Sequence, residues 1–465
     1  MERKHNPVSG LNHCPAEIVH QVLELLSVAD HRALCLVNTE FRAIAEPFLY
    51  SIIQFDWQWD DDEPPPLIPE LLRTLVASPQ LGTYTRSFHL TADLYQRHKS
   101  KTITPEMIIA EPDLGLWIPA IQRTGVPFRD IWIQELRNGR VDAFIALLLA
   151  QLPNLKYLCL KGGFPRQTAW IRMMFGSALC ESGRYTLPRF QHLRDVTFLA
   201  WEGDDPVRDQ YGKNTPAILP FFYLPSLERM SASIENPEPF TWPVAELPAP
   251  EKLEFLDLRT GCHEHLSEIL PVTQNLKVLD WRLYIYSGPK DTSRTHILEL
   301  DPILPALSHV RNTLTDLTVM VVYRPFSPPI KVMGSLRGIV YFDNIKKLKA
   351  PWAMMVGLAK DTTRRLQDAI PRNVECVTIT DHLASQLPSP SPGRPDWEWD
   401  DSSMIELLEY WLKEWRECTP RLRRVVLESV ILHLQPEQWG NEARARLRDL
   451  GTRFGVLVDF VEVEY

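Results

Sequence analysis

A short phrase recurs along most of this chain, and it constrains the fold more than any other feature. It consists of a Leu, two or three residues, an aliphatic residue, one more residue and a second aliphatic residue. Its alternating end predicts a short parallel strand whose alternate side chains face a core. The copies are LPNLKYLCL (152–160), FQHLRDVTF (190–198), LPSLERMSA (224–232), PEKLEFLDL (250–258), TQNLKVLDW (273–281), RNTLTDLTV (311–319), MGSLRGIVY (333–341), PRNVECVTI (371–379) and PRLRRVVL (420–427).

The spacing of these copies indicates an irregular repeat. The anchor leucines Leu155, Leu193, Leu227, Leu253, Leu276 and Leu314 are 38, 34, 26, 23 and 38 residues apart. Leucine-rich repeats run about 20–29 residues, so two gaps fit and the others need insertions or longer helices. Helical stretches at Asp142–Leu152 and Ser403–Glu417 precede two copies. The pattern therefore predicts an α/β chain that resembles an irregular leucine-rich-repeat solenoid over residues 51–465, although the Asn or Cys that usually turns such a repeat is mostly absent.

The N-terminal forty residues follow a different, helical pattern. Ile18, Val22, Leu25 and Leu26 recur at three- and four-residue steps, which places them on one helix face. Pro15 suits the first turn of that helix. We expect Asp30 to cap a second short helix and Thr39 to cap a third, with Pro47 breaking or kinking it. Three such short helices form a very small core, which usually needs a partner or an adjoining domain.

The same segment resembles an F-box of the large fungal F-box families. The matching positions are Pro15, Glu17, Ile18, Val22, Leu23, Leu26, Asp30, Leu34, Val37, Phe41, Arg42, Glu46, Pro47, Leu49 and Tyr50. The chain departs from the pattern at Cys14 and His31, where Leu is usual, and at Thr39 and Glu40, where basic residues are common. The downstream array is similar to the C-terminal arrays of the same families. The resemblance implies an F-box domain over residues 8–50 and a substrate-recognition domain over 51–465.

The resemblance also implies partners and a role. An F-box would bind a Skp-type adaptor and, through it, a cullin scaffold, while the repeat array binds a protein substrate that the sequence does not identify. We expect the adaptor contact at Pro15, Ile18, Val22, Leu23, Leu26, Leu34, Val37 and Phe41. Trp, Tyr and Arg residues on the strand phrases are the candidates for substrate anchors. The expected role is a non-catalytic substrate receptor of an SCF-type ubiquitin ligase; the alternative is an F-box or repeat scaffold that works outside a ligase.

Composition and missing motifs narrow the remaining classes. The net charge of −9, without a long Lys/Arg run, disfavours a nucleic-acid partner. Seven scattered cysteines without a close pair disfavour a zinc ribbon or a disulfide framework, and they suit a reducing compartment. No signal-like or membrane-spanning apolar run is present, so we expect a cytoplasmic or nuclear protein. The chain contains no nucleophile elbow, Walker loop or dinucleotide fingerprint, and we expect neither an enzyme nor a cofactor.

Three local patterns allow a functional and a structural interpretation. His263 and His265 in CHEHLSE are two residues apart and would point to different sides of a helix, so we expect a solvated loop rather than a metal site. The phrases DWQWDDDEPPP (56–66) and DWEWDDSSM (396–404) could display an acidic–aromatic hook, but helix-start chemistry is the simpler interpretation. The Ser/Pro-rich stretch from Leu383 to Pro395 predicts a flexible excursion, in which Ser389 and Ser391 are candidate sites for proline-directed kinases.

Overall fold

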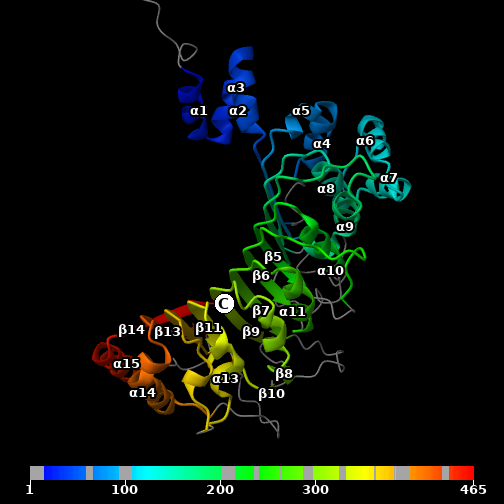
Figure 1. The fold of residues 1–465 in the computed structure, drawn as a ribbon. Coiled ribbons are helices and arrows are strands. Elements are labelled where there is room, and N and C mark those ends of the chain that lie inside the picture. Colours follow the sequence, from blue (N-terminus) through cyan, green and yellow to red (C-terminus); the bar gives the residue numbers. More distant parts are fainter. Residues whose placement is uncertain are drawn as a thin grey trace, which may run out of the picture. The chain divides into compact units, whose positions relative to one another are not determined.

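The computed structural model describes most of the chain. The described residues are 15–58, 66–93, 107–162, 164–200, 215–234, 240–260, 263–285, 297–323, 331–360, 363–381, 383, 398–431 and 439–464. The chain divides into two compact units (Figure 1). Unit 1 comprises Met1–Phe164 and Ala169–Leu193, and unit 2 comprises Pro165–Thr168 and Arg194–Tyr465.

Unit 1 begins with three short helices and continues into strands and longer helices. Its helices are α1 (Ala16–Glu24), α2 (Val28–Cys35), α3 (Thr39–Leu49), α4 (Ile68–Ala77), α5 (Pro79–Gly82), α6 (Glu111–Thr124), α7 (Arg129–Arg137), α8 (Val141–Leu149) and α9 (Ala169–Phe175), followed by the π-turn η3 (Gly176–Cys180). Its strands β1 (Ile52–Gln58), β2 (Ser87–Asp93) and β3 (Tyr157–Gly162) pair in parallel in this order. Every residue of α8 is buried, because other helices of unit 1 surround it.

Unit 2 is a parallel sheet whose strand order follows the chain. The order is β4 (Asp195–Ala200), β5 (Arg229–Ile234), β6 (Phe255–Thr260), β7 (Val278–Ile285), β9 (Asp316–Tyr323), β11 (Lys347–Pro351), β12 (Cys376–Thr380), β13 (Arg424–Ile431) and β14 (Leu457–Glu464). Strands β8 (Ile297–Glu299) and β10 (Lys331–Met333) form a separate parallel pair. A large parallel sheet with helical connections confirms the predicted α/β class.

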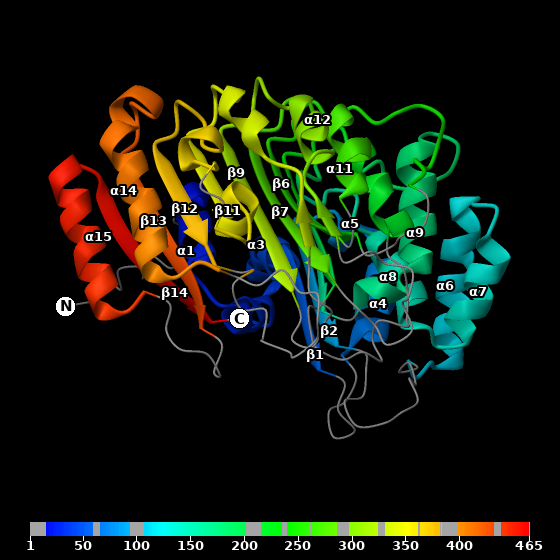
Figure 2. The ribbon, with the colours of Figure 1, turned by 90° about the horizontal axis from the view of Figure 1, so that it is seen from below.

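Helices and 3₁₀ turns connect the strands of unit 2. Among the described residues they are α10 (Thr215–Ile218), η5 (Leu219–Tyr223), α11 (Glu264–Ile269), η6 (Leu270–Val272), α12 (Ile303–Ser308), η7 (Arg337–Tyr341), α13 (Trp352–Val356), η8 (Leu366–Asp368), α14 (Asp401–Cys418) and α15 (Asn441–Phe454). The short 3₁₀ helix η2 (Phe164–Gln167) lies between β3 and α9. In Figures 1 and 2, α11 and α13 to α15 lie along one side of the strands. The other side of the sheet carries the polar strand side chains.

The recurring phrase predicts strands because its residues alternate between these two sides. The anchors Leu193, Leu227, Leu253, Leu276 and Leu314 are fully buried just before their strands. Within β4 the burial then alternates along the strand, so Val196 and Phe198 face the core while Thr197 is half-buried on the polar side. Eight of the nine phrases are confirmed as strands, counted from the strand bounds given above.

A repeated side-chain hydrogen bond joins neighbouring repeats just before their strands, and we call it the repeat-joining bond. In four repeats the Asn that precedes the anchor residue donates its Nδ2 to a backbone carbonyl of the preceding repeat. These bonds run from Asn154 to Thr83 (2.8 Å), Asn275 to Glu251 (2.8 Å), Asn344 to Asn312 (2.7 Å) and Asn373 to Asp343 (2.9 Å). Thr313 makes the same contact through its hydroxyl to Gln274 (2.9 Å). Asn therefore does have a repeated role in this array, at the position before the anchor.

The seventh phrase is where the strand prediction is wrong. Its end forms the 3₁₀ helix η7 rather than a strand. The buried residues Leu336, Ile339 and Phe342 are three apart, which is the period of a 3₁₀ helix. The strand of this repeat is β11, whose anchor is the fully buried Ile345 in NIKKLKA. The same spacing fits both segments, and the sequence pattern predicted a strand only at the earlier one. Strands β8, β10 and β14 were not predicted.

Other local predictions are confirmed or corrected. The two helical stretches predicted before strand phrases are confirmed as α8 and α14. Helix α3 continues through Pro47 to Leu49, so the expected break is wrong. Among the described residues no helix is long and apolar enough to cross a membrane.

Candidate functional site

The first candidate site is the surface of the three N-terminal helices. Helix α1 carries two apolar stripes. Val19 and Leu23, four residues apart, face inward and are 8% and 4% exposed. Ile18, Val22 and Leu25 follow the same helical spacing about one residue away and are 48%, 41% and 87% exposed. A helix with apolar residues on an exposed stripe as well as on its core stripe has a surface suited to a partner.

The inward stripe meets a small core. Val19, Leu23 and Ala45 form its buried centre, and the partly buried residues packed on it are Leu26, Leu34, Cys35, Ile44 and Phe48. This cluster is the apolar core of α1 to α3 among the described residues. It is small because the three helices have only 9, 8 and 11 residues. Apolar groups on the outer stripe have no place in this core.

Capping residues hold the helix starts. Ser27 caps α2 and accepts from the Asp30 amide, and Asp30 in turn accepts from the Ser27 amide at 3.1 Å. Asp30 belongs to this capping box, but it is the third residue of α2 rather than the N-cap that the sequence predicted. Asn38 caps α3 by accepting from the Phe41 amide at 2.8 Å, so Thr39 is the first helical residue rather than the cap.

His31 is one of the departures from the F-box pattern, and it lies inside the helical core. It is 6% exposed, its Nε2 lies 2.8 Å from the Leu23 carbonyl, and its ring stacks on Phe48 at 5.6 Å. The imidazole therefore joins α2 to α1 and α3 and does not reach the outer surface.

The eight residues expected to contact an adaptor divide by burial. Pro15, Ile18, Val22 and Val37 are exposed, and Phe41 is half-buried. Leu23 is buried in the core, and Leu26 and Leu34 pack against it, so these three hold the helices together instead of offering a surface. The apolar periodicity of the sequence alone did not distinguish the buried stripe of α1 from its exposed stripe.

Three exposed apolar residues were missed as surface candidates. Leu25 is 87% exposed, Val28 is 61% exposed and Leu36 is 78% exposed. Leu25 extends the outer stripe of α1, and Val28 starts α2 three residues later. The outer stripe of Ile18, Val22 and Leu25 is hereafter called the α1 surface.

The second candidate site is the polar side of the sheet in unit 2. The strand register places Asp257 of β6 beside Asp280 of β7 and Arg259 beside Arg282. The Nη2 of Arg282 lies 3.0 Å from Asp280 Oδ2, and the Nη2 of Arg259 lies 3.4 Å from Asp257 Oδ2. The result is a compact group of two acids and two cations, which we call the Asp–Arg cluster.

Burial changes the acidity of one member of this cluster. The Asp257 side chain is 11% exposed, and its Oδ1 has no hydrogen-bond partner among the described residues. Burial and the neighbouring Asp280 raise the pKa of Asp257 to about 6, against a smaller lowering by Arg282. Burial lowers the pKa of Arg282, but its hydrogen bond to Asp280 and the charges of Asp280 and Asp257 outweigh this and raise the pKa above its ordinary value. The cluster is therefore a charged, partly desolvated element on the polar side of β6 and β7.

Trp281 and Tyr284 of β7, two of the aromatic residues expected as substrate anchors, are buried. Trp281 is fully buried on the core side of β7, where its Nε1 donates to Thr260 Oγ1 at 2.9 Å. Tyr284 is 5% exposed. Neither side chain offers the exposed area that an interface anchor needs.

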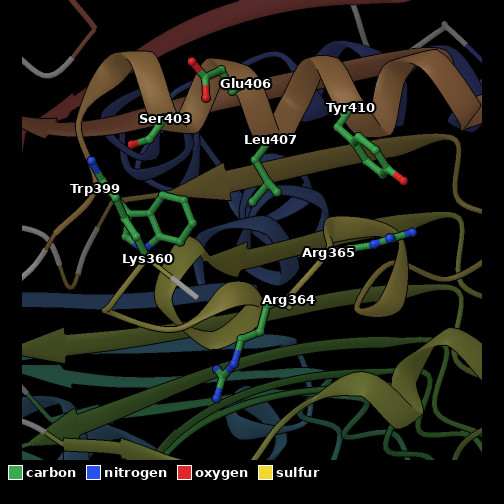
Figure 3. Close-up of a pocket in the computed structure, with 8 residues that line it drawn as sticks. All are labelled: Lys360, Arg364, Arg365, Trp399, Ser403, Glu406, Leu407 and Tyr410. Carbon is green, nitrogen blue, oxygen red and sulfur yellow. The ribbon is translucent and has the colours of Figure 1, made fainter. Parts of the chain in front are cut away.

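The third candidate site is a hollow beside α14, which we call the α14 groove (Figure 3). It has a volume of about 390 Å³ and is lined by Lys360, Arg364, Arg365, Trp399, Ser403, Glu406, Leu407 and Tyr410. In Figure 3, Leu407 and Tyr410 project from α14 toward the segment that carries Arg364 and Arg365. Arg365 holds its guanidinium carbon 5.0 Å from the centre of the Tyr410 ring.

One end of the α14 groove is built by the second Trp–acid phrase. Trp399 is 9% exposed, donates from Nε1 to the Gly357 carbonyl at 2.9 Å, and meets Trp352 edge to face at 5.3 Å. Asp400 caps α14 and pairs with Lys360. The hydrogen bond from Lys360 is the main reason that the pKa of Asp400 is lowered to about 2. The helix-start interpretation is thus confirmed for this phrase; most of the first phrase and Ser389 and Ser391 lie outside the described residues.

Other titratable groups have structural roles. Asp142 of α8 is buried and accepts from the Trp170 and Ile171 amides at 2.7 and 3.3 Å, so it caps α9. Burial raises its pKa to about 7 despite these bonds.

The expected loop at CHEHLSE is wrong from Glu264 onward, because α11 begins there and His265 is buried against Phe240. Among the described residues no three His, Cys, Asp or Glu side chains come together as a metal site.

Comparison with models of known protein families and with curated proteins found no match for this chain.

Proposed function

We propose that this chain is the substrate receptor of an SCF-type ubiquitin ligase, in which α1 to α3 act as an F-box that binds a Skp-type adaptor. The observation that carries the proposal is the α1 surface. Ile18, Val22 and Leu25 form an exposed apolar stripe directly beside the stripe that builds the core. Apolar residues gain stability when they are removed from water, so such a stripe on a marginal helical unit is best explained by a partner helix.

Unit 2 supplies the receptor surface in this proposal. We regard its strands β4 to β14 as an irregular leucine-rich-repeat array. Support comes from the in-register parallel strands, the buried anchors and the repeat-joining bond, which recur although the repeat lengths differ. Its polar side and the α14 groove offer charged and aromatic groups for a protein substrate.

A co-purification experiment tests the adaptor contact. The chain is co-expressed with a Skp-type adaptor as wild type, as the double variant Ile18→Asp with Leu25→Asp, and as Ile131→Asp. Ile131 is the matched control, because it is a 61% exposed isoleucine on α7 of the same unit. We expect the double variant to lose the adaptor and the control to keep it, with circular dichroism unchanged in both.

Two outcomes contradict the proposal. The F-box assignment is wrong if the double variant retains the adaptor at the wild-type level, or if the wild type binds none. When a cullin is co-expressed as well, adaptor binding without recovery of the cullin would favour the ligase-independent scaffold.

A further inference from the structure

The α14 groove is the hollow whose chemistry points most directly to a ligand. Its α14 wall is formed by Ser403, Leu407 and Tyr410, which follow one another at helical steps of four and three residues. Tyr410 lies seven helical steps after Ser403, or about 10 Å at 1.5 Å per residue. That length matches about three residues of extended peptide. A volume of about 390 Å³ lies within the ordinary range of ligand pockets, about 300–1,000 Å³.

The charges of the α14 groove favour an anion. Among the described residues that line it, Lys360, Arg364 and Arg365 stand against the carboxylate of Glu406 on the exposed side of α14. The carboxylates of Glu398 and Asp400 at one end of the groove are already matched by the Lys360 amide and the Lys360 side chain. Lys360 is already matched by Asp400, whereas Arg365 is exposed and lies over the ring of Tyr410. An arginine supported by an aromatic ring presents its remaining N–H donors to a carboxylate in a fixed plane.

The chain itself shows what this surface accepts, because its own segment Glu398–Trp399–Asp400 is bound at one end of the groove. The Glu398 amide donates to the Leu358 carbonyl at 3.2 Å, and Glu398 Oε2 accepts from the Lys360 amide at 3.0 Å. Trp399 fills the space between these contacts, and Asp400 pairs with the Lys360 side chain. An acid–aromatic–acid sequence is thus held by backbone contacts, a buried ring and a lysine.

We propose that the remainder of the α14 groove binds a partner peptide in which acidic residues flank an aromatic or large aliphatic residue. The apolar side chain lies between Trp399 and Leu407, and an acidic neighbour pairs with Arg365. A nucleic acid is disfavoured by the short cationic stretch and the net charge of −9. This inference deepens the receptor proposal, on which it rests for the biological meaning of the peptide as a substrate segment.

The test uses the purified full-length chain and defined peptides. Calorimetric titration compares acetyl-Gly-Glu-Phe-Glu-Gly-amide with the Gln-Phe-Gln and Lys-Phe-Lys versions, and with phenylacetate as a free small anion. We expect saturable binding of the Glu-Phe-Glu peptide. The Gln-Phe-Gln peptide should bind at least tenfold more weakly than the Glu-Phe-Glu peptide. Phenylacetate should also bind more weakly than the Glu-Phe-Glu peptide.

Matched variants locate the binding. Arg365→Glu places a repelling charge in the groove, whereas Arg416→Glu makes the same change at an exposed site of α14 outside it. Tyr410→Ala removes the ring beneath Arg365 from a position that is 39% exposed, so the fold is retained. We expect Arg365→Glu to weaken the Glu-Phe-Glu peptide at least tenfold, Tyr410→Ala to weaken it severalfold, and Arg416→Glu to leave it unchanged.

The inference is overturned by no saturable binding of the Glu-Phe-Glu peptide, by equal effects of Arg365→Glu and Arg416→Glu, or by phenylacetate binding as tightly as the peptide. An adaptor pull-down on the same preparations separates the two proposals. Lost peptide binding with intact adaptor binding overturns this inference alone, and the reverse result overturns the receptor assignment alone.

Discussion

The stability of the Asp257→Asn variant, measured relative to the wild type, should rise between acidic and neutral pH. Asp257 lies in the Asp–Arg cluster with its side chain 11% exposed, and its pKa in the folded chain is raised to about 6. In the unfolded chain an aspartate titrates near 3.9. The folded state therefore holds this proton more tightly than the unfolded state, and ionisation of Asp257 costs folding free energy.

The sign and size follow from this difference. Below about pH 4 the carboxyl is protonated in both states and contributes no penalty, while above about pH 6 it is ionised in both, and the folded state bears the cost. A difference of roughly 2 pKa units corresponds to about 3 kcal/mol. Asn cannot ionise, so the stability advantage of Asp257→Asn should grow by about 3 kcal/mol between pH 4 and pH 7.5.

Denaturant unfolding at a series of pH values measures this advantage. Intrinsic tryptophan fluorescence follows the unfolding of the whole chain, which has 14 tryptophans, among them the fully buried Trp281 on β7 beside β6. The control is Asp130→Asn, whose side chain is 84% exposed and whose replacement should change stability by less than about 0.5 kcal/mol at every pH. An advantage that stays constant with pH, or that shrinks as the pH rises, would refute the reasoning.

Two further predictions concern the framework. Asn275→Ala should lower the free energy of unfolding by about 1 kcal/mol, because it removes the repeat-joining bond to Glu251. Lys252→Ala changes the equivalent position of the preceding repeat and should lower it by less than about 0.5 kcal/mol. Equal losses in denaturant unfolding would argue against the bond. Gly162→Ala should destabilise the chain by more than about 1 kcal/mol, because Gly162 has a φ of +86° and an added Cβ would lie 2.5 Å from the Ala92 carbonyl oxygen. In Gly115→Ala on α6 the added Cβ meets nothing within 4 Å, so this change should instead stabilise the chain by about 0.5–1 kcal/mol. A shift of the thermal unfolding temperature in the same direction for both variants would contradict this account.

The strands were predictable because one physical rule generates them. A buried anchor followed by alternating burial leaves a clear period in the sequence, as in Leu276, Leu279 and Trp281. The rule fails where two segments satisfy it. Leu336 and Ile345 both begin acceptable phrases, and only the packing of the neighbouring strands selects Ile345.

The candidate sites were less predictable, for two reasons. On α1 the sequence shows that Ile18, Leu23 and Leu25 are apolar, but the choice of inner stripe depends on how α2 and α3 pack, which no local pattern contains. The α14 groove was missed because its two walls, around Lys360 and Tyr410, are about 50 residues apart along the chain. The Trp399 phrase was the only sequence signal there, and its interpretation as a helix start was correct but incomplete.

The repeat-joining bond has a consequence for how such an array can change length. Each bond sets the position of a strand start against the preceding repeat, and its length is 2.8 Å where the anchors are 23 residues apart and 2.9 Å where they are 38 apart. Extra chain added after the carboxyl end of a strand leaves every bond intact. A single-residue deletion between Asn275 and Val278 would move every side chain of β7 to the opposite face. Loops on one edge are thus open to evolutionary and engineered variation, while the other edge tolerates only the insertion or removal of whole repeats.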